Sequence, residues 1–316
     1  MHLKLLGLLA LLSFATSHAA AEDIPAPANP DIQHVLTIPR GGLAEFLARP
    51  DNPIPMVSHH RGGPMPGFPE NSMEAMQNAL SYGYGLMEID VAQLKDGTLI
   101  LMHDDTLSRT TTGEGAVRQK TWEDVKELFL KDENGTVTTF RIPKLRDVLL
   151  WAKNRTVVTL DIKRGVDFAK VAAMVQETGS QDYSAGISYT LDQAVAFHRL
   201  APNMPLSIGI SSDEDIAAFD ASGIPSNLVL AWTGTRLRAP SFYQKLHARG
   251  WRVLVGTLGW RESSIDNQIK AGQSEFTYRD IVKMGADVIA TDRFWAVQKE
   301  IASSNLYIFS VQRVAN

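Results

Sequence analysis

Residues 86–91 read Leu-Met-Glu-Ile-Asp-Val, and this short run decides how the rest of the chain is interpreted. Its apolar and β-branched residues predict a buried strand, on which Glu88 and Asp90, two residues apart, share one face. Seven similar runs follow or precede it, separated by amphipathic stretches: Met56–His60, Thr156–Lys163, Ala185–Tyr189, Leu206–Ile210, Leu228–Trp232, Arg252–Thr257 and Val288–Thr291. Eight strands alternating with helices predict an α/β fold of the closed (β/α)8 barrel type.

The stretches between these runs carry the signals of helices. The predicted helices are Ser72–Tyr84, Leu145–Asn154, Phe168–Thr178, Leu191–Leu200, Asp213–Phe219, Ser241–Arg249 and Thr277–Met284. Ser72 and Asp213 can cap helix starts, and glycines fall where several helices should end. A doubly wound open sheet shares this alternation, but no glycine-rich dinucleotide fingerprint follows the first strand.

The N-terminal residues 1–21 are expected to be a signal peptide. Lys4 precedes an apolar run of about a dozen residues and then small residues, ending Ala19-Ala20-Ala21. The alternative is a membrane anchor, for which the run is shorter than the roughly 20 residues needed to span a bilayer. We therefore expect a periplasmic or secreted protein without stable membrane insertion, divided into an N-terminal linker and leading segment at 22–54, whose start is rich in proline, a barrel at 55–303 and a tail at 304–316.

Composition narrows the classes of function. The chain has 316 residues, of which 44% are hydrophobic and 21% charged, as in ordinary soluble domains. It has no cysteine, which excludes disulfides, thiol catalysis and cysteine-ligated zinc. A net charge of −4 gives no basic field to recruit nucleic acid, so the expected partner is a small molecule. The sequence does not indicate an oligomeric state.

The interval from about Leu94 to Arg155 breaks the strand–helix rhythm. A turn at Asp96-Gly97 is followed by a strand-like arm at Thr98–His103, and a helix is expected to begin near Thr121. We interpret this interval as an insertion on a βα loop. Such loops, at the carboxyl ends of the strands, carry the catalytic groups of barrel enzymes.

Four polar clusters are predicted to meet at that end of the barrel: His59-His60-Arg61-Gly62, Glu88-Ile89-Asp90, His103-Asp104-Asp105 and Asp161-Ile162-Lys163. Glu88 and Asp90, with Asp161 from another strand, offer the oxygen ligands that Ca²⁺ or Mg²⁺ prefers. A solvent-facing acidic pair is the alternative for Glu88 and Asp90. Lys163 can neutralise a phosphoryl oxygen or form a structural ion pair.

Two histidines beside an acidic metal site can supply the base and the acid that phosphodiester cleavage needs. His59 and His60 must face opposite sides if both lie on a strand, so one of them is expected to be structural. His103 is the second candidate. We interpret the remaining histidines as ordinary residues: His2, His18, His34, His198 and His247. Glu70, in Pro69-Glu70-Asn71-Ser72, lies at a helix start and could also face the mouth.

These residues resemble the glycerophosphodiester phosphodiesterase family, because its separated motifs occur in the right order over residues 55–297. They are His60-Arg61-Gly62, Pro69-Glu70-Asn71-Ser72, Glu88-Ile89-Asp90, Lys95-Asp96-Gly97, His103-Asp104-Asp105-Thr106-Leu107-Ser108-Arg109-Thr110-Thr111, Ile142-Pro143-Lys144-Leu145 and Gly285-Ala286-Asp287 through Thr291-Asp292. The resemblance implies a barrel with catalytic His60 and His103, a phosphate contact at Arg61, and metal ligands Glu88, Asp90 and Asp161. The chain departs from the family at Asp161, where glutamate is usual, and at Arg293-Phe294, which we expect to alter the pocket rim.

The function expected from this resemblance is metal-dependent hydrolysis of glycerophosphodiesters to glycerol 3-phosphate and an alcohol. One alternative is phospholipase D-like cleavage of lysophospholipids or sphingolipids, which needs an apolar groove at the mouth. Candidate groove residues are Trp122, Phe129, Trp232, Trp260 and Phe294. Another alternative is a barrel that binds phosphorylated ligands without cutting them.

Overall fold

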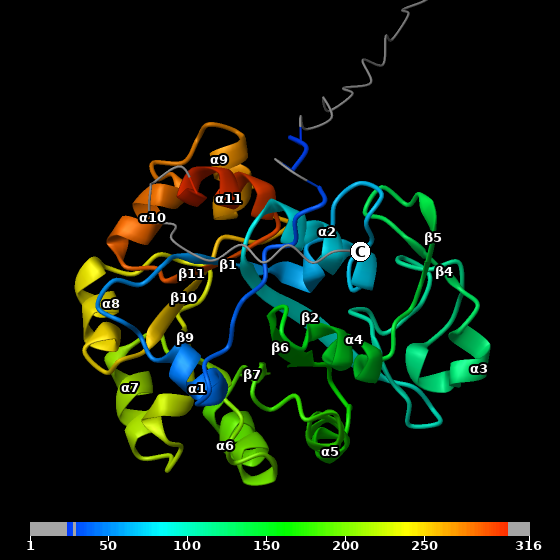
Figure 1. Ribbon diagram of the computed structural model, residues 1–316, viewed down its shortest axis with the longest axis horizontal. Coiled ribbons are helices and arrows are strands. Elements are labelled where there is room, and N and C mark those ends of the chain that lie inside the picture. The colour runs from blue at the N-terminus through cyan, green and yellow to red at the C-terminus, as the bar shows by residue number, and fades with distance from the viewer. Residues whose placement is uncertain (1–23, 28–29, 303–316) are drawn as a thin grey trace, which may run out of the picture.

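The computed structural model, which describes residues 24–27 and 30–302, is a closed barrel of eight parallel strands (Figure 1). The strands are β1 (Met56–His59), β2 (Gly85–Gln93), β6 (Val157–Ile162), β7 (Ser184–Ser188), β8 (Leu206–Gly209), β9 (Val229–Trp232), β10 (Arg252–Gly256) and β11 (Val288–Thr291). Strand β1 pairs with both β11 and β2, which closes the sheet. The prediction of a (β/α)8 barrel is therefore confirmed, and the open sheet is excluded.

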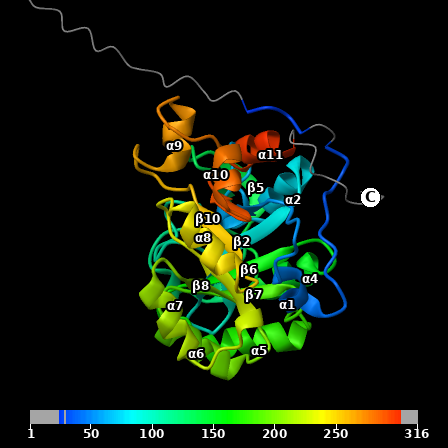
Figure 2. The ribbon, with the colours of Figure 1, turned by 90° about the vertical axis from the view of Figure 1, so that its left-hand side faces the viewer.

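Helices surround the strands, as Figures 1 and 2 show. They are α2 (Met73–Tyr82), α4 (Leu145–Ala152), α5 (Phe168–Thr178), α6 (Leu191–Leu200), α7 (Asp213–Asp220), α8 (Pro240–His247), α9 (Ile265–Lys270), α10 (Tyr278–Met284) and α11 (Phe294–Ala302). The Ser72 hydroxyl caps α2 as predicted, accepting a hydrogen bond from the backbone N–H of Ala75. The predicted cap at Asp213 is wrong, since Ser212 caps α7 and Asp213 is its first helical residue.

The insertion forms a small layer beside the mouth. Strand β3 (Leu99–Leu101) pairs antiparallel with the end of β2, and a separate two-stranded sheet joins β4 (Phe129–Lys131) to β5 (Val137–Arg141). The helix predicted near Thr121, α3 (Trp122–Val125), is only four residues long. Since α4 contacts β6 and α5 as a barrel helix, the inserted part ends before Leu145 rather than at Arg155.

The leading segment closes the opposite end of the barrel, where the strands begin. Its backbone is fixed by hydrogen bonds from His34 N–H to the Leu80 carbonyl and from Leu36 N–H to the Arg155 carbonyl. Helix α1 (Gly42–Leu47) then lies over the strands, as the blue ribbon of Figure 1 shows. Side chains of this segment and of the strand starts form one apolar cluster: Leu36, Leu43, Leu47, Met56, Leu86, Val157, Ala185, Leu230, Leu254, Val288 and Ala290.

The predicted signal peptide at 1–21 and tail at 304–316 lie outside the described residues. Among the residues that are described, none of the helices has the length and apolar character required to cross a bilayer. The part of the leading segment that the sequence suggested to be a linker is, from about residue 34 onward, an ordered element of the barrel.

Candidate active site

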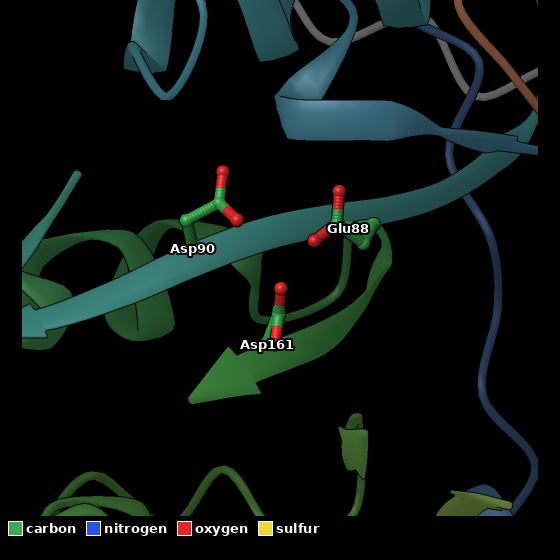
Figure 3. A group of neighbouring side chains, drawn as sticks. All are labelled: Glu88, Asp90 and Asp161. Atoms are coloured by element: carbon green, nitrogen blue, oxygen red, sulfur yellow. The ribbon is translucent and has the colours of Figure 1, made fainter. Parts of the chain in front are cut away.

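Three carboxylates gather near the carboxyl ends of β2 and β6. Asp90 is the register partner of Asp161 across the two strands, and Glu88 precedes Asp90 by two residues on the same face. One oxygen of each lies within 4.8 Å of the others. Figure 3 shows Asp161 pointing from β6 toward β2, from which Glu88 and Asp90 project. The structure thus brings together the three residues predicted as metal ligands, and a donor set of oxygens alone suits a hard cation.

Burial and the neighbouring charges set the protonation of this cluster. Burial and the charge of Asp90 raise the pKa of Glu88 to about 8. The Lys163 ammonium lies 2.5 Å from Asp90 Oδ1 and 2.6 Å from Asp161 Oδ2. Burial opposes ionisation of Asp90, but Lys163 outweighs it and holds the pKa of Asp90 below its usual range. Lys163 thus forms the structural ion pair that was one of the two roles predicted for it from the sequence.

The adjacent histidines have different surroundings. His59 is fully buried, its ring centroid 5.2 Å from that of Phe294, and its Nδ1 contacts the Leu86 carbonyl. Burial lowers the pKa of His59 to about 4. The Nδ1 of His60 lies 2.5 Å from Asp292 Oδ1. Burial alone would lower the pKa of His60, but Asp292 and Glu88 outweigh it and raise that pKa to about 8. This agrees with the prediction that one of the pair is structural.

A tight turn after β1 begins at His60. Arg61 has a φ of 51°, and its backbone N–H donates to Glu88 Oε2 at 2.7 Å. Gly62 has a φ of 78°, and a Cβ there would meet Met76 Cγ at 2.9 Å. Glycine is therefore required at this turn, because any side chain would disturb the residues that connect the histidine to the acidic cluster.

His103 is held by a chain of charged groups that leads back to Arg61. Its Nδ1 lies 2.7 Å from Asp104 Oδ1. Arg109 donates to both oxygens of Asp104 and to both oxygens of Glu70, at 2.6–2.9 Å. Glu70 also accepts from Arg61 Nη1 at 3.0 Å. Glu70 therefore faces the mouth, as the sequence allowed, and links the insertion to the first turn of the barrel.

Comparison with known proteins places this site in a family. Residues 60–294 match the model of the "Glycerophosphoryl diester phosphodiesterase family". The chain belongs to this family. A crystal structure of a glycerophosphoryl diester phosphodiesterase from Parabacteroides distasonis is 30% identical, with a TM-score of 0.76 over 89% of this chain and 96% of that one. The prediction of a phosphodiesterase of this class is confirmed.

Two further relatives of this phosphodiesterase differ in what they show. A glycerophosphodiester phosphodiesterase from Bacillus altitudinis is 31% identical over 45% of this chain and 61% of its own length, so the match spans less than two thirds of that relative. A phosphodiesterase from Oleispira antarctica, solved in complex with its product sn-glycerol-3-phosphate, is 19% identical, with a TM-score of 0.59 over 79% of this chain and 97% of that chain. The second likeness shows the fold alone.

Several contacts of the phosphodiesterase site were not predicted from the sequence. The Asn71 amide donates to Asp90 Oδ2 at 2.6 Å, and the Asp90 N–H donates to Asn71 Oδ1 at 2.9 Å. The Tyr189 hydroxyl donates to Asp161 Oδ2 at 2.8 Å. Asp292 was quoted only as part of a motif, yet it contacts His60 from 232 positions away. Buried Asp266 fixes its backbone by accepting from the Asp292 N–H at 2.8 Å.

The mouth of this phosphodiesterase contains two cavities that meet at His60. The inner cavity, of about 200 Å³, is lined by Glu88 and Asp161 together with apolar side chains, among them Trp232. The outer cavity, of about 610 Å³, lies toward the insertion and is lined by Trp260 and by several charged residues: Arg61, Glu70, Arg109, Lys131 and Asp132. The site therefore has one largely apolar side and one charged side.

The expectation that Phe294 alters the pocket rim is wrong. Its side chain is 1% exposed and packs behind His59, with its ring also 5.3 Å from that of Tyr82. Of the other aromatic residues proposed to line a groove, two lie in the insertion and two line the cavities. Trp122 lies under Lys144 and Phe129 under Arg141 in the insertion, whereas Trp232 and Trp260 line the cavities.

Proposed function

We propose that this protein hydrolyses glycerophosphodiesters to glycerol 3-phosphate and an alcohol in a metal-dependent reaction. The observation that carries the proposal is that two histidine–aspartate pairs, His60–Asp292 and His103–Asp104, border one cluster of three carboxylates. The 30% identical glycerophosphoryl diester phosphodiesterase from Parabacteroides distasonis supports the substrate class. The family supports the reaction type.

The carboxylates of Glu88, Asp90 and Asp161 are the residues that would hold a divalent cation, Ca²⁺ or Mg²⁺. They fit it because they offer oxygen donors within 4.8 Å of one another and because burial and the charge of Asp90 raise the pKa of Glu88 to about 8, an effect that a bound cation would oppose. When bound, such a cation polarises a phosphoryl oxygen and offsets charge that develops there. Asp161 is shorter than glutamate, and Lys163 and Tyr189 hold its carboxylate in place.

In the proposed mechanism each histidine uses its Nε2. Because Nδ1 of each ring contacts a carboxylate, Nδ1 carries the proton in the neutral form and Nε2 is left for chemistry. One imidazole takes the proton of the nucleophile, either water or a substrate hydroxyl, and the other donates a proton to the departing alkoxide. Arg61, at the outer cavity, and Lys163 offset charge on the phosphoryl oxygens.

The phospholipase D-like alternative keeps one supporting observation. Trp232, Leu254 and Leu258 give the inner cavity an apolar wall next to His60. This apolar wall belongs to the smaller cavity, of about 200 Å³, whereas the larger outer cavity is lined mainly by charged and polar residues. This balance favours a small polar alcohol over a long acyl chain. A non-cleaving barrel is disfavoured by the complete set of paired histidines.

The test is a metal-supplemented assay on glycerophosphocholine and lysophosphatidylcholine, with identification of the products. We expect glycerol 3-phosphate and choline, and loss of activity when the metal is chelated. His60→Ala and His103→Ala should each reduce turnover by roughly 10²- to 10⁴-fold, as expected for a general acid or base. His198→Ala, on α6, is the matched control. Unchanged turnover in both active-site variants would exclude the mechanism, and faster lysolipid cleavage would favour the alternative.

We also propose that the protein is exported, on the basis of residues 1–21 alone. Cleavage is expected after Ala19 or Ala21. N-terminal sequencing of the protein recovered from the periplasm or medium of a bacterial host would test this, and recovery of the intact N-terminus from the cytoplasm would contradict it.

A further inference from the structure

A separate cavity of about 240 Å³ lies at the end of the barrel opposite the mouth. It is enclosed between the leading segment and the starts of β1, β2 and β10, and its lining residues are mainly apolar: Val35, Leu36, Phe46, Ile54, Pro55 and Met56. Exposed Asn52 also borders it. None of these residues belongs to the catalytic cluster. The feature to explain is the one strongly charged side chain in this lining, Arg252.

Arg252, the first residue of β10, is only 7% exposed, and its guanidinium is poorly satisfied. Its Nε donates to the Phe46 carbonyl at 3.2 Å. Its Nη1 is buried and has no hydrogen-bond partner among the described residues. Burial, the largest influence on it, lowers the pKa of Arg252. A guanidinium has five donors, so most of its hydrogen-bonding capacity is unused.

The nearest carboxylate cannot provide the missing partner, because it is already engaged. Asp287 accepts from Arg49 Nε at 3.0 Å, contacts His247 Nε2 at 3.0 Å and accepts from the Val253 N–H at 2.8 Å. With Arg49 paired to Asp287, Arg252 has no direct carboxylate partner and is left with an electrostatic attraction to Asp287 and a cation–π contact, its Cζ lying 5.6 Å from the centroid of the Phe46 ring. Buried charges in proteins are normally paired, because an unpaired one is costly to desolvate.

We propose that this cavity binds a small organic anion, whose carboxylate pairs with Arg252 and whose short aliphatic body fills the apolar part. Ligand sites are commonly lined by apolar side chains with a single charged group that orients the ligand. Planar guanidinium and carboxylate groups form charge-assisted, often bidentate, hydrogen bonds. The site is distinct from the catalytic one, and the proposal does not depend on the proposed reaction.

Calorimetric titration of the full-length chain with hexanoate tests the proposal. Hexan-1-ol serves as the uncharged ligand of similar shape, and acetate as the ligand that lacks the aliphatic body. We expect hexanoate to bind more tightly than either. Arg252→Met should weaken hexanoate binding by about 10- to 100-fold, the effect of losing hydrogen bonds to a charged group. Arg252→Lys should retain part of the affinity, because its charge is kept.

Arg199→Gln, an exposed arginine on α6, is the matched control and should bind hexanoate like the unchanged protein. A thermal unfolding curve establishes that Arg252→Met is folded, and unchanged phosphodiesterase activity shows that the mouth is intact. A crystal structure with 6-bromohexanoate should place the carboxylate beside Arg252. Absence of hexanoate binding, equal binding by Arg252→Met, or density for water only in the cavity would overturn the proposal.

Discussion

The two ends of the barrel, although built on the same eight strands, carry different side chains: charged and polar groups at the mouth and apolar groups at the closed end. At the mouth, carboxylates, histidines and cations contact one another in a network that runs from Asp292 through His60 on one side and from His103 through Arg109 to Glu70 on the other. At the closed end, the leading segment packs leucines against the strand starts. In barrel enzymes the carboxyl ends of the strands carry the chemistry, and the amino ends carry stability.

This comparison predicts that changes at the closed end affect stability and leave catalysis unchanged, while changes at the mouth do the reverse. Leu47→Ala is expected to give the largest stability effect. Leu47 is 2% exposed in the cluster between α1 and the strands, and loss of a buried leucine costs about 2–5 kcal/mol. Urea unfolding should show this decrease, while kcat at a temperature where the variant is folded should be unchanged.

The matched control for Leu47→Ala is Leu150→Ala on α4, whose side chain is 43% exposed and should cost little. A large fall in kcat for Leu47→Ala, measured on folded protein, would show that the closed end is coupled to the mouth and would break the comparison.

The second prediction uses the buried histidine that lies next to the mouth but belongs to the core. The pKa of His59 is lowered from 6.5 to about 4, so the folded protein keeps this ring neutral where the unfolded chain would protonate it. The contribution of the neutral His59 ring to stability is fully present above pH 6.5. As the pH falls from 6.5 toward 4 this contribution is lost, which lowers the free energy of unfolding by up to about 3 kcal/mol.

Urea unfolding at pH 7.5 and pH 5 checks this for the unchanged protein and for His59→Asn, whose amide can still donate to the Leu86 carbonyl. The variant should lose less stability between the two pH values. Equal losses in the two proteins would mean that His59 is not kept neutral by burial.

The sequence predicted the barrel well and the site only in part, for physical reasons. Strand and helix periodicity is local, so all eight barrel strands could be found from runs such as Leu86–Val91. Adjacent clusters on parallel strands also predicted that Asp90 and Asp161 would meet. In contrast, β4 and β5 are short, partly exposed strands without a clear alternation, and they were not anticipated.

Contacts between loops that are distant in the chain could not be predicted from sequence. The closed barrel predicted that β1 and β11 would be neighbours, but the pairing of His60 with Asp292 also depends on the directions of side chains in the turns after these strands, which periodicity does not give. The clamp of Asn71 on Asp90 depends on a left-handed backbone at Asn71, with a φ of 57°. The packing of the leading segment against the strand starts was not predicted, because the prolines at the start of residues 22–54 are typical of a linker.

The third prediction concerns Asp292, a positioning residue at the mouth that contacts His60 rather than the substrate. Asp292→Asn keeps the shape of the contact but removes the charge. We expect kcat/KM to fall by about 10- to 100-fold, the loss of a charge-assisted hydrogen bond expressed in the transition state. Because Asp292 helps raise the pKa of His60 to about 8, the pH profile of the variant should also shift toward lower pH.

A purely structural role for Asp292 would change stability without moving the pH profile, so the profile decides between the two. Asp213→Asn is the matched control, since Asp213 forms an exposed ion pair with Lys245 far along the chain. An unshifted profile in Asp292→Asn would contradict the role assigned to the His60–Asp292 pair.

The smallest effect at the mouth is expected from Tyr189→Phe. The Tyr189 hydroxyl donates to Asp161 Oδ2, and burial together with Asp161 raises the pKa of this phenol, so it remains a donor at neutral pH. Asp161 keeps a second partner in Lys163, so the carboxylate is still held when the hydroxyl is removed. A net hydrogen bond is worth about 0.5–1.5 kcal/mol, which predicts a roughly 2- to 10-fold weaker apparent affinity for the metal in activity titrations.

Tyr183→Phe provides the structural counterpart of Tyr189→Phe, because the Tyr183 hydroxyl donates to the buried Leu149 carbonyl away from the mouth. It should lower the free energy of unfolding by about 1 kcal/mol and leave the metal titration unchanged. The Tyr189 side chain is 66% exposed overall, although its hydroxyl is partly buried against Asp161, so Tyr189→Phe should show the opposite pattern, with little change in unfolding. If both variants changed only stability, Asp161 would not need its phenolic partner to bind the cation, and the departure from glutamate at this position would have to be compensated by Lys163 alone.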